Sequence, residues 1–173
     1  MKKSLWIILA MAVSVNAWAN QPANFTPPKT SSELEEIKSL EGKWQGTAKE
    51  ANGQDRPTTV EYRVTSGGSA VEEKLFTGTE HEMISMYHDV KGKLSMTHYC
   101  MLGNQPQLEL KSSAAGKLEL KESGASSALL AEQMRMGSLT LEYPDKNTLT
   151  QTWTAQDAEG KAMPPTVIQL KRV

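Results

Sequence analysis

The residues best suited to chemistry lie within or beside one short stretch, Met86 to Cys100. This stretch holds two of the three histidines, His88 and His98, and the single cysteine, and Glu82 precedes it. Imidazole, thiolate and carboxylate groups bind zinc, and a methionine beside a histidine and a cysteine suits copper. The same residue types could form a cysteine nucleophile, its base and an orienting acid. A structural role competes with both hypotheses, because cysteine is among the most buried residue types and methionine fills irregular cores.

The pattern around these residues predicts a β-hairpin that turns at Lys91-Gly92. A three-residue loop with Gly92 in the left-handed conformation, as a G1 bulge, would pair Asp89 with Lys93. A two-residue loop would shift the register by one and set each apolar row against a polar row, so we prefer the first register. In that register one face carries the residues that we expect to line an interior: Glu82, Ile84, Met86, His88, Leu94, Met96, His98 and Cys100.

This geometry limits the metal hypothesis. His88 and His98 would lie four positions apart along the ladder, or about 13 Å, so they cannot share one ion. Glu82, His98 and Cys100 could share one, because cross-strand partners lie about 5 Å apart. We expect a cavity wall first, in which the apolar side chains supply contact and His88, His98 and Glu82 fix a ligand by hydrogen bonds. Zinc, copper or haem bound through His98 and Cys100 or Met96 is the alternative.

Catalysis is less expected than binding. Cys100, His98 and Glu82 at adjacent strand positions seldom form the line that a nucleophile, base and orienter need. The acidic residues at 72, 73, 80 and 82 could supply paired carboxylates, but we expect Glu73 and Glu80 to be solvated charges on a rim. The sequence therefore predicts no catalytic residue.

The rest of the chain changes from helical to two-residue periodicity. A short helix is expected from residue 31 or 32 to 40, since Leu34, Ile37 and Leu40 share a face. Ser32 with Glu35 fits a capping box at its start, and Ser31 is the other candidate cap. Alternating apolar rows follow at 60–64, 108–110, 118–120, 139–143, 149–153 and 167–173. A helical turn is possible at 126–135. About ten short strands between Gly- and Asn-rich turns predict an all-β fold, an up-and-down antiparallel barrel.

The N-terminal residues predict export. Lys2 and Lys3 precede an apolar run over 5–15, and Ala17-Trp18-Ala19 fits a cleavage site, so we expect 1–19 to be a signal peptide. Residues 20–30 would form an extended Pro-rich tether and 31–173 the barrel domain, in the periplasm or outside the cell. The remaining 154 of 173 residues suit one domain. They carry 17 basic and 20 acidic residues, without a basic stripe, so we expect no nucleic acid as partner.

Several segments resemble a known class of barrels. Gly42-Lys43-Trp44, at the start of the first strand after a short helix, resembles the lipocalin and wider calycin signature, and Gly46 makes it similar to nitrobindin-type ten-stranded barrels. The segments 66–73, 78–83, 86–88, 97–100 and 103–106 resemble a group of exported bacterial lipocalin-like proteins. The resemblance implies that Trp44 plugs the closed end of the barrel and that Arg172 packs across it. Nitrobindin-type proteins bind haem through a histidine near the C-terminus, which this chain lacks after His98, so a haem function is not carried over.

Together these observations predict an exported barrel that binds a small, largely apolar molecule. Two alternatives remain open: a periplasmic metal or haem protein using His98 and Cys100, and a packed barrel that contacts an envelope partner through its outer face or tether. The sequence does not specify the oligomeric state.

Overall fold

The fold is known from a computed structural model, which describes residues 26, 28–50, 52–124 and 134–173. The predicted signal peptide and most of the tether lie outside these residues. The helical turn expected at 126–135 lies outside them too, except for its last two residues, and Arg135 begins a strand.

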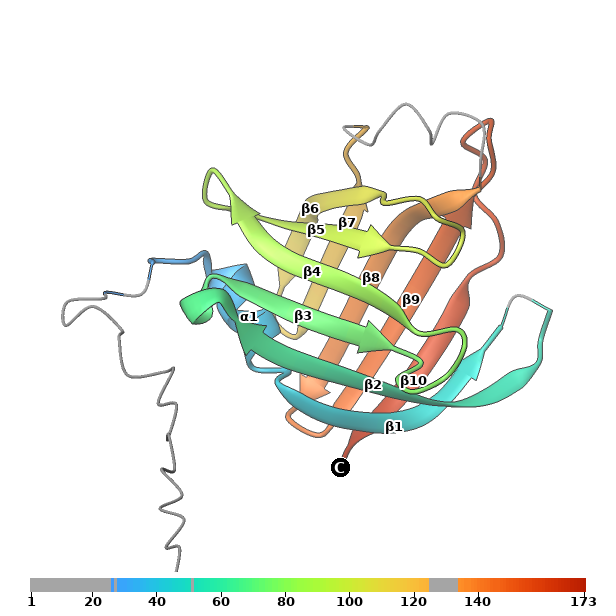
Figure 1. The fold of residues 1–173 in the computed structure, drawn as a ribbon, viewed down its shortest axis with the longest axis horizontal. Helices are drawn as coiled ribbons and strands as arrows, with labels where there is room; N and C mark the ends of the chain where they lie inside the picture. Colours follow the sequence, from blue (N-terminus) through green and yellow to red (C-terminus); the bar gives the residue numbers. More distant parts are fainter. Residues whose placement is uncertain (1–25, 27, 51, 125–133) are drawn as a thin grey trace, which may run out of the picture.

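Ten antiparallel strands form a closed barrel in which each strand pairs with its neighbours in the chain and β1 pairs with β10 (Figure 1). The predicted up-and-down antiparallel barrel with a short N-terminal helix is therefore confirmed. The elements are α1 (Ser32–Lys38), β1 (Gly42–Lys49), β2 (Asp55–Thr65), the 3₁₀ turn η1 (Ser66–Gly68), β3 (Ala70–Leu75), β4 (Met83–Val90), β5 (Lys93–Tyr99), β6 (Gln107–Ala114), β7 (Lys117–Glu122), β8 (Arg135–Asp145), β9 (Thr148–Gln156) and β10 (Thr166–Arg172).

Helix α1 covers one end of the barrel, where β2 ends and β3 begins (Figure 1). Leu34, Ile37 and Leu40 are buried there. The preferred cap, Ser32, is wrong: the Ser31 hydroxyl accepts the Leu34 N–H at 3.1 Å. The reason is a contact with the wall, because the Asp89 carboxylate on β4 accepts both the Ser31 N–H at 2.6 Å and the Ser31 hydroxyl at 2.7 Å.

Trp44 and Arg172 complete this closed end. The Trp44 side chain is fully buried and donates its indole N–H to the Leu40 carbonyl at 2.9 Å. The Arg172 guanidinium lies 4.3 Å from the centroid of the Trp44 ring. It also donates to the backbone carbonyls of Ser39, Glu41 and Lys146. This is the contact that the resemblance implied, and it connects α1 to the last strand.

The register predicted for the β4–β5 hairpin is wrong. Val90 pairs with Lys93, so the loop has two residues, Lys91 and Gly92. Both have positive φ, at 52° and 78°, as in the tight turns that match the right-handed twist of hairpins. With this shift Leu94, Met96 and His98 of β5 point into the barrel as expected, but on β4 the opposite row of side chains points inward. The interior side chains of β4 include Ser85 and Tyr87, both fully buried, and the residues on the opposite face are Ile84, Met86 and His88.

Candidate functional site

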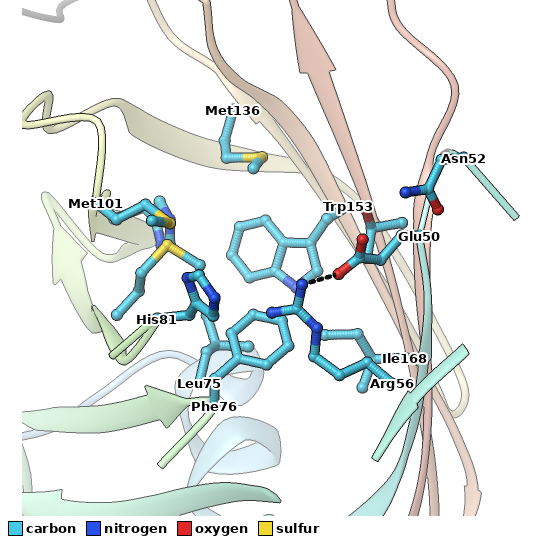
Figure 2. A pocket seen from close by; sticks show the side chains of 13 residues that line it. Glu50, Asn52, Arg56, Leu75, Phe76, His81, Met101, Met136, Trp153 and Ile168 are labelled. Carbon is cyan, nitrogen blue, oxygen red and sulfur yellow. Dashed lines mark ion pairs between the residues drawn. The ribbon is translucent and has the colours of Figure 1, made fainter. Parts of the chain in front are cut away.

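The barrel holds a cavity of about 440 Å³ at the end opposite α1. Figure 2 shows its side chains around a common space, with Trp153 on one side and Met101, His81 and Phe76 facing it. Its mouth includes Asn52 and Met101, which are exposed, so the cavity opens to solvent. The lining is mostly apolar and consists of Glu50, Asn52, Arg56, Leu75, Phe76, His81, Met83, His98, Met101, Met136, Trp153, Thr166 and Ile168.

An ion pair lies at the mouth of the cavity. The Arg56 guanidinium is 2.5 Å from the Glu50 carboxylate (Figure 2). It also lies 5.9 Å from the centroid of the Phe76 ring, which is within range of a cation–π contact. Because the two charges are paired, the mouth offers little net charge to a ligand.

Below the cavity lies a layer of hydrogen-bonded polar side chains, which we call the polar layer: Tyr62, Glu73, Ser85, Tyr87, His98 and Gln151. All six are almost fully buried. Tyr62 and Gln151 each donate to one Glu73 oxygen at 2.6 Å, and Tyr87 donates to the other at 2.9 Å. The carboxylate of Glu73 is therefore the centre of this layer.

Burial governs the titration of these groups. It raises the pKa of Glu73, while the hydrogen bonds from Tyr62, Tyr87, Gln151 and Ser85 oppose that rise. Burial also raises the pKa of Tyr62 and Tyr87 well above the usual value, and the nearby Glu73 charge adds to the rise. Both phenols therefore keep their protons and act as donors. The expectation that Glu73 is a solvated rim charge is wrong, because β3 turns this position inward.

His98 connects the polar layer to the cavity. Its Nδ1 atom lies 3.1 Å from the Ser85 Oγ, and its ring packs against Trp153 with 5.0 Å between ring centroids. Its other ring nitrogen, Nε2, is buried and has no hydrogen-bond partner. Burial lowers the pKa of His98 from 6.5 to about 4. The imidazole is therefore neutral at neutral pH.

Only one of the eight predicted lining residues, His98, lines this cavity. Leu94 and Met96 are fully buried in the core below it. Ile84, Met86 and His88 lie on the other face of β4, since the register differs from the expected one. Glu82 is exposed in the loop before β4 and accepts the Gly78 N–H at 2.7 Å. Cys100 is half-buried in the loop after β5.

The proposed metal ligands Glu82, His98 and Cys100 depended on the wrong register, in which Glu82 faced Cys100. Among the described residues, no group of three or more His, Cys, Asp or Glu side chains is placed to hold a metal ion. In the same part of the chain, no helix is long and apolar enough to span a membrane.

Sequence reasoning missed the most polar part of the site. Tyr62 and Trp153 were expected only as members of alternating strand rows, and Gln151 was assigned no role. A signal was present, because Gln151 stands between Leu149 and Trp153 in an inward row, and a polar residue there predicts a buried partner. The donation from the Trp153 indole N–H to the Gln151 side-chain oxygen, at 3.0 Å, is one such contact.

Comparison with known proteins supports the fold only. No protein-family model matches the sequence, and no curated protein matches it. One solved structure with a similar fold is a protein of unknown function from the DUF3598 family of Nostoc punctiforme, with a TM-score of 0.53 and 13% sequence identity. The match covers 79% of this chain and 49% of that one, so this chain spans about half the length of that protein.

Proposed function

We propose that this chain is an exported, lipocalin-like barrel protein that binds a small, largely apolar molecule in the cavity at its open end. The observation that carries the proposal is the cavity itself, because about 440 Å³ lies in the size range of ligand pockets. Its apolar lining with a few polar groups is also typical of such pockets. The apolar members are Leu75, Phe76, Met83, Met101, Met136, Trp153 and Ile168.

Two further features support the class and the location. The Gly-x-Trp start of β1 and the Arg172 contact with Trp44 are what a lipocalin-like barrel would have. The basic residues 2 and 3, the apolar run and the Ala-x-Ala site support export to the periplasm or beyond.

Substitution at Ile168 tests the cavity. Ile168→Trp adds volume to the lining, and Val167→Trp is a matched control one position along β10 on the opposite face. We expect 2-methoxynaphthalene, an apolar two-ring probe, to bind the wild type and Val167→Trp in titration calorimetry and to bind Ile168→Trp at least tenfold more weakly. Equal binding by all three proteins, or none by the wild type, would contradict the proposal. Native mass spectrometry of the purified protein would then show the class of the natural ligand.

One observation supports metal or haem binding as a second candidate. Histidines that bind metals usually donate the N–H of one ring nitrogen to a protein group and bind the metal through the other, and His98 has its Nδ1 near Ser85 and its Nε2 without a partner. Addition of haemin, and separately of zinc or copper, would give a stoichiometric complex that His98→Ala loses and His81→Ala keeps. An unchanged haemin spectrum and no bound metal would reject this candidate.

The cavity argues against the packed-barrel alternative, which expects no room for a ligand. A role for the outer face or the Pro-rich tether in contacting an envelope partner stays a prediction.

A further inference from the structure

We infer that the buried end of the ligand carries a neutral hydrogen-bond donor, a hydroxyl or N–H group, that binds the Nε2 atom of His98. The inference rests on the proposed binding function and narrows its ligand class. It excludes a carboxylate as the part of the ligand that contacts His98 at the buried end of the cavity.

The position of the proton on His98 follows from the polar layer. Glu73 accepts from Tyr62, Gln151 and Tyr87. The Ser85 hydroxyl also acts to lower the Glu73 pKa, against the effect of burial. Three donors at hydrogen-bond distance suit an ionised carboxylate, which is an acceptor only. The Ser85 hydroxyl has one proton, and we place it toward Glu73 because Ser85 helps to lower the Glu73 pKa. The Ser85 oxygen then accepts at the 3.1 Å contact with His98. The proton of the neutral imidazole therefore lies on Nδ1, and Nε2 carries a lone pair.

The lone pair lies where a ligand could use it. His98 faces the interior from β5 and lines the cavity. With Nδ1 directed to Ser85 on the neighbouring strand, Nε2 lies at the far side of the ring, away from the backbone. A buried acceptor without a partner carries a desolvation cost, which a donor on the ligand would remove.

The same network disfavours an anion at this point. His98 is neutral, because burial lowers its pKa to about 4, and Ser85 separates it from the negative charge of Glu73. A ligand carboxylate would meet a lone pair instead of a donor and would approach a buried like charge. An ether oxygen would also find no donor at Nε2, so a hydroxyl or N–H is the group that fits.

Access requires movement of the cavity lining, since Nε2 is closed to solvent without a ligand. Met83, Met101 and Met136 belong to that lining. Methionine side chains are flexible and adapt to irregular shapes. We therefore expect a ligand to reach His98 by displacing these side chains rather than by moving strands.

Three naphthalene derivatives of similar size test the inference: 2-naphthol, 2-methoxynaphthalene and 2-naphthoate. Calorimetry gives the affinity of each for the wild type and for His98→Phe, which keeps a ring against Trp153 but has no acceptor. His81→Phe is the matched control, because His81 lines the same cavity at its mouth. For each protein we compare the ratio of its affinity for 2-naphthol to its affinity for 2-methoxynaphthalene. We expect this ratio to be about two- to tenfold higher in the wild type than in His98→Phe, which is the effect of one hydrogen bond. His81→Phe should keep the wild-type preference, and 2-naphthoate should bind most weakly.

Equal preference for 2-naphthol in the wild type and His98→Phe would overturn the inference while leaving the proposed function intact, as would tightest binding of 2-naphthoate. Binding of none of the three by the wild type would overturn both. If His98→Phe does not fold, Ser85→Ala replaces it. That variant removes the acceptor that holds the proton on Nδ1, so the preference for 2-naphthol should fall, and an unchanged preference would overturn the inference.

Discussion

The Nδ1 atom of His98 lies 3.1 Å from the hydroxyl oxygen of Ser85, its partner across β4 and β5. His98 lines the cavity, and the Ser85 hydroxyl also acts to lower the pKa of the buried Glu73. The contact between His98 and Ser85 exists only in the register with a two-residue loop, because the expected register would have placed Ile84 opposite His98. One turn of the chain at Lys91-Gly92 thus decides which side chains reach the site.

The depressed pKa of His98 predicts acid sensitivity. The folded pKa is about 4 and the ordinary value is 6.5, so between these pH values the unfolded chain binds a proton that the native barrel does not. The contribution of His98 to the free energy of unfolding is fully present above about pH 6.5. It is lost as the pH decreases toward 4, which lowers the free energy of unfolding by about 3 kcal/mol. Urea unfolding of the wild type and His98→Phe at pH 7 and pH 4 measures the difference. Identical pH dependence in the two proteins would contradict the assignment of this shift to His98.

Glu73→Gln tests the polar layer. An amide presents an NH₂ group to side chains that now donate to a carboxylate, so at least one buried donor loses its acceptor. We expect the free energy of unfolding to fall by about 1–3 kcal/mol for each such group. Glu72→Gln is the control, since its 3.2 Å ion pair with Arg63 lies at the surface, where such pairs contribute about 0–1 kcal/mol. Similar losses in both variants would show that Glu73 has no special role in stability.

Gly46 permits the close approach of β1 and β10 that closes the barrel. A Cβ atom at this position would lie 1.8 Å from the Gln169 carbonyl oxygen and 2.8 Å from its carbon. Since backbone cannot yield as a side chain can, we expect Gly46→Ala to lower stability by about 3 kcal/mol or more. Thr47→Ala, at the next and exposed position, should change it by less than about 0.5 kcal/mol. Thermal unfolding followed by circular dichroism distinguishes the two variants. A small loss of stability in Gly46→Ala would mean that β1 and β10 can move apart at little cost in free energy, which would contradict the prediction.

Arg172→Met tests the closed end. The substitution keeps a long side chain over Trp44 but removes the charge and the donors to three backbone carbonyls. We expect a loss of about 2–4 kcal/mol, from one cation–π contact and charge-assisted hydrogen bonds. Lys171→Met, at the neighbouring exposed position, is the control. Equal denaturation midpoints for both variants would refute a role for Arg172 in closing the barrel.

The barrel could be predicted from the sequence because its signals are local. Period-two rows such as Val60, Tyr62 and Val64 indicate strands, and Gly- and Asn-rich turns at short spacing indicate a meander. The helix and its buried face followed from Leu34 and Ile37 in the same way. Its cap did not, because the choice of Ser31 depends on a carboxylate 58 residues away.

The site was harder to predict for a physical reason. The hairpin register was chosen by assuming that the more apolar face of β4 points inward, whereas this barrel contains a polar layer. Ser85 and Tyr87 are inside because Glu73 on β3 and Gln151 on β9 supply partners for that layer. Such pairing joins segments far apart in the chain, and periodicity within one strand carries no information about it.

The most direct measurement of the central claim is the ¹⁵N spectrum of the histidine side chains, recorded without ligand, with 2-naphthol and with 2-methoxynaphthalene. We expect His98 to be neutral with its proton on Nδ1. We also expect 2-naphthol, unlike the ether, to shift the Nε2 resonance of His98 in the direction of an acceptor that gains a donor. A proton on Nε2 in the free protein, or a His98 spectrum that 2-naphthol leaves unchanged at saturation, would contradict the account.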